Sequence, residues 1–278
     1  MDKENQDFHE EQPDWEALFT EEEAKEWEKD KAKRKKRKKM AAKIVSSLLV
    51  FAMLISGLGM WFDVFNLPAI HFVKVSNQLS KKPEVKEYKK AVVTLEWDGA
   101  KGTGFNIAPD GLIITNEHVV EKSNRVNVHF SNGDSFAGKV IAKRPEWDLA
   151  IVDIEKAKKL PVLSIAVEKE WETWAGEKII FIGNPLAYTQ IANEGTFISP
   201  VLVNGLDIPV MMIEAPIYKG NSGSPVINQD GQVIGVIFAT LQNPEITTKE
   251  IIGAAVPSYY IQQIMEEINK DNKLEEQF

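Results

Sequence analysis

From Ala91 onward the chain consists of short β-rich runs separated by turn signals, and this pattern restricts the fold more than any other feature. Turn residues gather at Pro109–Gly111, Ser131–Asp134 and Asn228–Gly231. Many short strands joined by Gly, Asn and Asp turns are typical of all-β sandwiches and barrels. We therefore predict an all-β domain over residues 91–278. The strand-like runs are Ala91–Trp97, Gly104–Ile107, Leu112–Thr115, Val126–Phe130, Lys139–Ala142, Leu149–Ile154, Lys178–Ile182, Val210–Ile213, Val233–Phe238 and Ile251–Val256.

The C-terminus of this domain has a different pattern. After Pro257, apolar residues recur at Ile261, Ile264, Met265 and Ile268. This spacing places them on one face of a helix, so we predict an amphipathic C-terminal helix.

The N-terminal part of the chain contains a basic segment followed by an uncharged segment. Residues 44–62 carry no charge, and as a helix they would rise about 28 Å, close to the hydrocarbon thickness of a bilayer. We predict a single transmembrane helix there. A core helix would show a polar face, and a signal peptide rarely follows a long charged segment.

The nine Lys and Arg residues between positions 31 and 43 predict a cytoplasmic tail over residues 1–43 and a cell-membrane protein whose remainder lies outside the cytoplasm. Residues 63–90 are predicted to form a stalk, because Lys81–Lys90 is charged and shows little apolar periodicity.

Composition narrows the classes of function. The formal net charge of −8 argues against nucleic acid as a partner. The chain has no cysteine, which rules out thiol catalysis, disulfides and cysteine-based metal sites.

The segment Gly220–Val226 reads Gly-Asn-Ser-Gly-Ser-Pro-Val. A serine among glycines can sit on a tight turn with its hydroxyl exposed. The N–H groups of Gly220 and Ser222 can then point at one spot, where the oxyanion of a tetrahedral intermediate would form. The alternative is an ordinary turn between two strands.

A nucleophilic serine needs a general base. His118 directly follows an apolar run and is the best candidate, although a histidine bonded at a strand end would look the same. His9 lies in the tail, and His71 lies in the stalk. His129 lies on the polar face of a strand-like run, where we expect a surface or structural histidine.

Asp148 opens the apolar run Leu149–Val152, an awkward place for an unpaired charge. It is the candidate acid that would orient the base, although it could also be a turn aspartate. The order His118, Asp148, Ser222 is the order of the chymotrypsin triad and differs from those of subtilisin and the α/β-hydrolases.

Taken together, these segments resemble the HtrA/DegP family of trypsin-like serine proteases over residues 90–268. The resemblance implies a chymotrypsin-like double β-barrel with the active site between the barrels. It implies Ser222 as nucleophile, His118 as general base and acid, Asp148 as orienting acid, and Gly220 and Ser222 as the oxyanion hole. It also suggests a homotrimer. We expect no metal and no cofactor. The matching segments are Gly102–Phe105, Thr115–Val120, Asp148–Val152, Ile182–Pro185, Gly220–Gly223 and Gly253–Pro257.

Two positions in the serine segment depart from the family. Ser224 replaces a second glycine, which makes it a rival nucleophile. A serine there also occurs in the related glutamyl endopeptidases. Asn221 replaces the aspartate with which digestive relatives bind a freshly cut N-terminus, so we do not expect activation by such a cut.

The pocket positions also differ from those of relatives that prefer charged residues. Pro216 stands where trypsin has an acid, and Ile237 stands where glutamyl endopeptidases have a histidine. We therefore predict cleavage after small or medium apolar residues, in a pocket formed by Val236, Ile237, Phe238, Ala239 and Thr240. About twenty residues follow Pro257, which is too few for the PDZ domain that many family members carry.

The sequence thus leads to one principal hypothesis and one alternative. The first is a membrane-anchored serine endopeptidase that cleaves misfolded or exported proteins outside the cytoplasm by acyl-enzyme chemistry, as part of protein quality control and the stress response. Its partners would be those protein substrates and the lipid bilayer. The alternative is a catalytically inactive protease-like domain that binds or senses peptides at the membrane.

Overall fold

The computed structural model describes two compact units, residues 1–66 and 67–278, and each is considered by itself. The backbone is described for residues 20–64, 67–154, 159–185, 188–215, 217–241 and 252–275, whereas the side chains of residues 24, 54–71 and 271–275 are outside the description.

The first unit contains one long helix, α1 (Glu21–Val64). A capping box begins it: the Thr20 N–H donates to Glu23 Oε2 (3.0 Å) and the Glu23 N–H donates to Thr20 Oγ1 (3.4 Å). Each bond satisfies a donor that would otherwise be free at the helix N-terminus. Among the residues described, no helix is both long enough and apolar enough to cross a membrane. The transmembrane helix predicted over residues 44–62 is therefore not confirmed.

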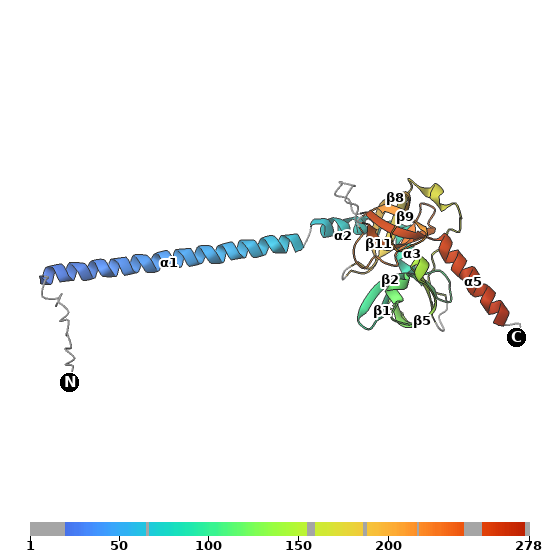
Figure 1. Cartoon of the computed structure of the whole chain (residues 1–278), viewed down its shortest axis with the longest axis horizontal. Coiled ribbons are helices and arrows are strands. Elements are labelled where there is room, and N and C mark those ends of the chain that lie inside the picture. Colours follow the sequence, from blue (N-terminus) through green and yellow to red (C-terminus); the bar gives the residue numbers. More distant parts are fainter. Residues whose placement is uncertain are drawn as a thin grey trace, which may run out of the picture. The chain divides into compact units, whose positions relative to one another are not determined.

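The second unit is built on two closed six-stranded antiparallel barrels (Figure 1), as the resemblance implied. Their strand orders are β1-β2-β3-β6-β5-β4 and β10-β11-β12-β9-β8-β7. The strands of the first barrel are β1 (Val92–Trp97), β2 (Ala100–Asn106), β3 (Leu112–Thr115), β4 (Arg125–His129), β5 (Ser135–Arg144) and β6 (Leu149–Ile154). The strands of the second barrel are β7 (Lys178–Gly183), β8 (Ile191–Leu202), β9 (Pro209–Glu214), β10 (Pro225–Ile227), β11 (Val233–Leu241) and β12 (Ile252–Pro257).

Each of the ten strand-like runs predicted from the sequence overlaps a strand, but β8 and β10 were not foreseen. The sequence of β8 contains Asn193, Glu194 and Gly195 and is interrupted again by Pro200, so it lacks the apolar alternation of a strand. β10 has only three residues. Both strands exist because partners on either side of them supply the hydrogen bonds.

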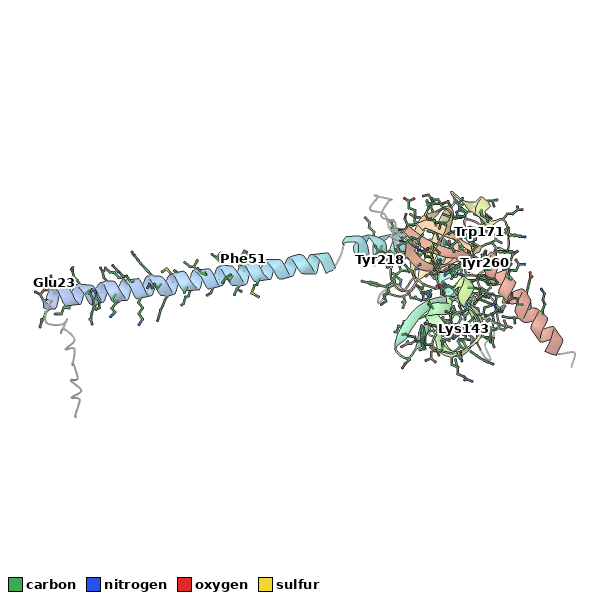
Figure 2. All side chains as sticks on the ribbon, in the orientation of Figure 1. Glu23, Phe51, Lys143, Trp171, Tyr218 and Tyr260 are labelled. Carbon is green, nitrogen blue, oxygen red and sulfur yellow. The ribbon has the colours of Figure 1, made fainter. Side chains whose placement is uncertain are left out.

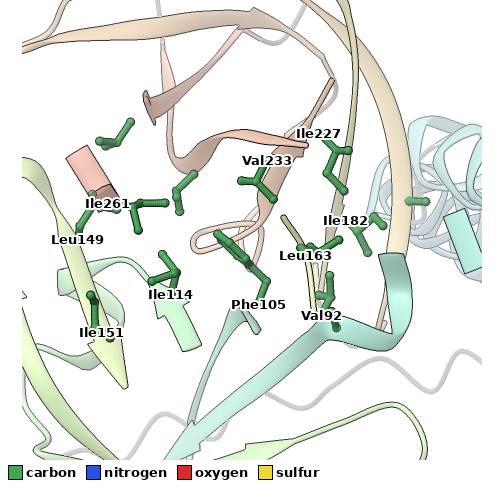
Figure 3. Close-up of a cluster of buried hydrophobic side chains, with 14 of the residues drawn as sticks. Val92, Phe105, Ile114, Leu149, Ile151, Leu163, Ile182, Ile227, Val233 and Ile261 are labelled. Carbon is green, nitrogen blue, oxygen red and sulfur yellow. The ribbon is translucent and has the colours of Figure 1, made fainter. Parts of the chain in front are cut away.

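Three apolar clusters stabilise this unit. One fills the first barrel and another fills the second. The third joins the barrels, and in it Phe105 of β2 lies among side chains of both barrels (Figure 3). Phe105, Leu149, Ile182 and Val236 of this shared cluster are fully buried. Burial of apolar surface is the main force that holds the two barrels together.

Residues 67–91 form α2 (Leu67–Leu79) and α3 (Pro83–Ala91), which differs from the stalk expected over residues 63–90. Phe72, Leu79 and Val85 are buried, and α2 packs on β8. The Ser76 hydroxyl accepts a hydrogen bond from the Ala192 N–H of β8 (3.1 Å). In α3 the apolar residues are few and stand among lysines, whereas α2 is a short apolar run with one lysine. Neither pattern indicated that the two helices would pack on a barrel.

The C-terminal helix is present as predicted, as α5 (Tyr259–Glu275). Ile261 and Ile264 are buried in the cluster between the barrels. Tyr260 packs on Trp147 of the first barrel, with ring centroids 5.2 Å apart, and Arg144 forms a salt bridge with Glu267 (2.6 Å). Although it follows the last strand of the second barrel, α5 also contacts the first.

Candidate active site

The structure brings His118 and Asp148 together. His118 lies on the short helix α4 (Glu117–Val120), directly after β3. Its Nδ1 is 2.8 Å from Asp148 Oδ2 and 2.9 Å from Oδ1. The His118 backbone N–H also donates to Asp148 Oδ1 (3.0 Å). The carboxylate thus fixes both the ring and the backbone of His118, and an Nδ1–H tautomer leaves Nε2 free to act as a base.

The local backbone structure orients the Asp148 carboxylate toward His118. A 3₁₀ turn over Pro145–Trp147 ends at Asp148, whose φ of 48° is left-handed. Aspartate is among the few non-glycine residues that tolerate this region. The buried Asn116 side chain donates to the Asp148 carbonyl oxygen (2.9 Å), which holds the unusual conformation in place.

The pKa of His118 is raised above its ordinary value. The main cause is the hydrogen bond to Asp148, which favours the protonated ring. Partial burial opposes this effect, whereas the charges of Asp148, Glu117 and Glu121 reinforce it. The ring is therefore a stronger base than free histidine, as proton abstraction from a serine requires.

Residues 218–224, here called the nucleophile loop, directly precede β10 and carry Ser222. Gly220 has a φ of 100°, a conformation that glycine adopts without strain. The N–H groups of Asn221, Gly223 and Ser224 donate to carbonyl oxygens of Tyr218, Ile237 and Asn221. Among the described residues, those of Gly220 and Ser222 donate to none. The two free donors are those that the sequence assigned to the oxyanion hole.

The nucleophile loop reaches the first barrel next to His118. The Thr103 N–H of β2 donates to the Ser222 carbonyl oxygen (3.2 Å). The preceding residue, Gly102, abuts Val119, because a Cβ built on it would lie 2.5 Å from Val119 Cγ1. Ser222 and His118 therefore flank the same short stretch of β2. The Ser222 hydroxyl itself donates to the Phe238 carbonyl oxygen (3.4 Å), and the described contacts include no Ser222–His118 hydrogen bond.

Residues 102–236 match the family model of the trypsin-like peptidase domain. A probable periplasmic DegP-like serine endoprotease of Chlamydia pneumoniae is 34% identical over 218 residues, covering 77% of this chain and 41% of the relative. Serine protease HTRA1A of Danio rerio is 34% identical over 188 residues, covering 65% of this chain and 37% of the relative. The chain thus spans less than half the length of either relative.

A solved structure has the same fold as this two-barrel domain. It is the inactive form of Rv3671c from M. tuberculosis H37Rv, carrying a serine-to-alanine mutation. The TM-score is 0.58 at 27% identity, covering 69% of this chain and 93% of the other. The matches and the geometry of the site together support a serine endopeptidase.

The two-barrel domain also contains a polar contact that the sequence did not reveal. The Thr103 hydroxyl donates to the Gly220 carbonyl oxygen (2.8 Å) and accepts from the Asn184 N–H (3.0 Å). Asn184 in turn donates through Nδ2 to the Val93 carbonyl oxygen (3.0 Å). Thr103 and Asn184 lie in segments that resemble the family, but nothing in the sequence pairs Thr103 with a glycine 117 positions away.

Asn221 and Ser224 are fully buried. Ser224 cannot reach a substrate in this conformation, which argues against it as the rival nucleophile. Neither the Ser224 hydroxyl nor the Asn221 side-chain amide has a partner among the described residues. Both pack against Gly183, where an added Cβ would lie 2.2 Å from Ser224 Oγ and 2.6 Å from Asn221 Oδ1. Because Gly183 has no side chain, the side chains of Asn221 and Ser224 can occupy this space.

The five predicted pocket residues of β11 divide into two groups. The side chains of Val236 and Ile237 are buried in apolar clusters, so in this conformation they do not line an open pocket. Phe238 and Ala239 are half-buried, and Thr240 is exposed. These three side chains remain accessible to a substrate. Pro216 lies outside the described residues.

The other histidines are elsewhere. His129 is on β4, where its Nδ1 is 2.8 Å from Ser135 Oγ and its Nε2 is 3.7 Å from Glu96 Oε2. It is a partly exposed structural histidine, as expected. His9 lies outside the described residues, and only the backbone of His71 in α2 is described.

Proposed function

We propose that this chain is a serine endopeptidase of the HtrA type that cleaves misfolded or exported proteins outside the cytoplasm. The observation that carries the proposal is the bonded His118–Asp148 pair, placed beside a loop with two free N–H donors around Ser222. The names of the relatives, serine endoprotease and serine protease, support the reaction class, and the word periplasmic supports the location.

The reaction proceeds in two halves. His118 Nε2 takes the proton of the Ser222 hydroxyl as Oγ attacks the carbonyl carbon of the scissile peptide. The tetrahedral intermediate collapses as protonated His118 gives that proton to the leaving amine. An acyl-enzyme on Ser222 remains. His118 then takes a proton from a water molecule as the water oxygen attacks the carbonyl carbon of the ester. Protonated His118 returns that proton to Ser222 Oγ as the bond to the acyl group breaks, and the acid product leaves.

Each supporting group has a defined part in these steps. The N–H groups of Gly220 and Ser222 receive the oxyanion, and one such donor contributes about 100- to 1,000-fold in rate. The Asp148 carboxylate stabilises His118 while the ring carries the extra proton. To bring Ser222 Oγ to His118, the serine side chain turns away from the Phe238 carbonyl. Such contacts often tighten only when the substrate is bound.

The substrate preference belongs to the proposal as well. We propose cleavage after small or medium apolar residues, at a site bordered by Phe238, Ala239 and Thr240. None of these three side chains carries a charge that would attract a basic or acidic residue. Cleavage-site profiling with a peptide library tests this, and a preference for Lys, Arg or Glu would contradict it.

Membrane anchoring through residues 44–62 is likewise proposed from the sequence. Nineteen consecutive residues without charge, next to a basic segment, support it. The test is carbonate extraction of membranes from cells that express the full chain. Recovery in the pellet is expected, and release into the supernatant would contradict anchoring. Assembly as a homotrimer is a separate proposal, tested by the mass of the detergent-solubilised chain.

A second candidate is a protease-like domain that binds peptides without cleaving them. It is favoured by the Ser222 hydroxyl, which is bonded to Phe238 rather than to His118.

The decisive experiment compares the full chain with Ser222→Ala and Ser224→Ala. Casein hydrolysis and fluorophosphonate labelling are expected for the wild type and for Ser224→Ala, and neither is expected for Ser222→Ala. Hydrolysis by Ser222→Ala would refute the nucleophile. An unlabelled, inactive wild type that still binds casein would support the second candidate.

A further inference from the structure

We propose that Thr103, a residue of the first barrel, is a positioning residue for the oxyanion hole carried by the second. This inference rests on the proposed protease function and adds a role that the triad does not contain. Thr103 does not touch a substrate. It acts through the two peptide groups that flank the Ser222 N–H.

The first of these peptide groups is Gly220–Asn221. Its carbonyl oxygen accepts from the Thr103 hydroxyl (2.8 Å). Its N–H, that of Asn221, donates to the Tyr218 carbonyl oxygen (3.0 Å). The plane of this peptide is thus held from both edges, once by the first barrel and once by the loop itself.

The second peptide group is Ser222–Gly223. Its carbonyl oxygen accepts from the Thr103 backbone N–H (3.2 Å), and its N–H donates to the Ile237 carbonyl oxygen (2.8 Å). The peptide between the two held groups is Asn221–Ser222, whose N–H is one oxyanion donor. The carbonyl oxygen of this peptide, that of Asn221, accepts from the Ser224 N–H (3.0 Å). Because each peptide group is planar, the two held neighbours further restrict the direction of the Ser222 N–H.

Without the bond from Thr103, Gly220 would be the residue of the loop with the greatest conformational freedom. Its φ of 100° is accessible because glycine has no side chain, and the same freedom allows other conformations. Those conformations would turn the Gly220 N–H, the other oxyanion donor, away from the site. The bond from the Thr103 hydroxyl to the Gly220 carbonyl oxygen counters this freedom directly.

The Thr103 hydroxyl is well suited to hold the loop. The residue is fully buried. Its hydroxyl oxygen accepts from the Asn184 N–H of the second barrel (3.0 Å), so its single proton is available for Gly220. Close packing adds a further restraint, because a Cβ built on Gly223 would lie only 1.9 Å from the Thr103 carbonyl oxygen. The loop therefore rests directly on β2.

The test uses Thr103→Val, which keeps the shape of the side chain and removes the hydroxyl, and Thr103→Ser, which keeps the hydroxyl. The matched control is Thr115→Val. Thr115 is equally buried, and its hydroxyl donates to the Thr103 carbonyl oxygen (2.7 Å) but makes no hydrogen bond to the nucleophile loop. The full chain is reacted with a fluorophosphonate, and both the rate and the final extent of Ser222 labelling are measured.

For Thr103→Val we expect the labelling rate to fall about 10- to 100-fold. The final extent and the pH midpoint set by His118 should not change. Thr103→Ser should restore the rate to within about threefold of wild type, and Thr115→Val should remain in that range. A purely structural role would instead lower the final extent and affect both valine variants alike.

Several results would overturn the inference. A Thr103→Val protein labelled at the wild-type rate refutes it and leaves the protease function standing. An equal loss of rate in Thr103→Val and Thr115→Val refutes it too. A wild type that is never labelled refutes the protease function, and the inference falls with it. If Thr103→Val does not fold, Thr103→Ala carries the same comparison against Thr103→Ser.

Discussion

At the scale of single residues, the site contains a histidine, His118, that is more basic than free histidine, and a loop in which partly exposed and buried residues alternate. Gly220 and Ser222 are partly exposed, whereas Asn221, Gly223 and Ser224 are buried. The residues whose N–H groups would bind the oxyanion thus alternate with residues that pack the loop against the barrels. Two predictions concern individual side chains of this arrangement.

The first is a pH dependence. Because Asp148 raises the pKa of His118, we expect labelling of Ser222 to increase with pH through a midpoint above about 6.5, the value of free histidine. Asp148→Asn should lower both this midpoint and the maximal rate, the rate by about 10²- to 10⁴-fold. Rates at a series of pH values test this, with His129→Asn as the control that keeps the wild-type midpoint.

The same raised pKa has a consequence for folding. A raised pKa in the folded state means that protonation of His118 stabilises the fold. This stabilisation is present below the pKa of the unfolded chain and is lost as pH rises through the folded pKa. The contribution should disappear in Asp148→Asn. If the activity midpoint of that variant equals the wild-type value, Asp148 does not set the pKa of His118.

The second residue-scale prediction concerns Ser224. Its buried hydroxyl has no partner among the described residues, and an unpaired buried hydroxyl costs about 1–3 kcal/mol. Ser224→Ala should therefore leave the free energy of unfolding unchanged or raise it by about 1 kcal/mol, with activity retained. Urea unfolding measures the first and casein hydrolysis the second. A loss of more than about 1 kcal/mol would show that the hydroxyl is bonded in solution.

At the scale of elements, α2 links the N-terminal side of the domain to the nucleophile loop. The ring of Phe72 meets that of Tyr218 edge-on, with centroids 5.0 Å apart and an interplanar angle of 79°. Tyr218 lies beside α2 (Figure 2), and its carbonyl oxygen accepts from the Asn221 N–H. The seating of α2 is therefore connected to the loop that carries Ser222.

Phe72→Ala tests this connection. Loss of a buried phenylalanine should lower the free energy of unfolding by about 3 kcal/mol, and we expect slower labelling of Ser222 as Tyr218 loses its support. Leu79→Ala is the control, because Leu79 is equally buried on α2 but belongs to the cluster between the barrels. It should lower stability without slowing the labelling of the folded protein. Equal labelling rates in the two variants would argue against the connection.

At the scale of the whole domain, the two barrels share one apolar cluster, and both contribute residues to the proposed active site. Figure 3 shows Phe105 between side chains of β1, β3, β7 and β11. His118 and Asp148 come from the first barrel, and Ser222 comes from the second. The domain can be active only while the shared cluster holds the barrels in register.

We therefore expect the barrels to unfold together. Phe105→Ala should lower the free energy of unfolding of residues 67–278 by about 3–5 kcal/mol. Tryptophan fluorescence and far-UV circular dichroism should still give one coincident transition in urea. Two separate transitions would mean that the barrels are independent, contrary to the shared cluster.

The sequence by itself determined the class of fold, ten of the strands, the C-terminal helix and the residues of the proposed triad. These features depend on local patterns: apolar runs, turn residues, and functional groups placed at the ends of strands. Other features were decided only by the tertiary structure. The strand β8 depends on its two neighbours in the chain, β7 and β9. The docking of α2 and α3, the burial of Ser224 and Ile237, and the bond between Thr103 and Gly220 depend on a partner far away in the chain. No local pattern identifies such a partner, because contact between distant residues is settled only when the two barrels close and pack together.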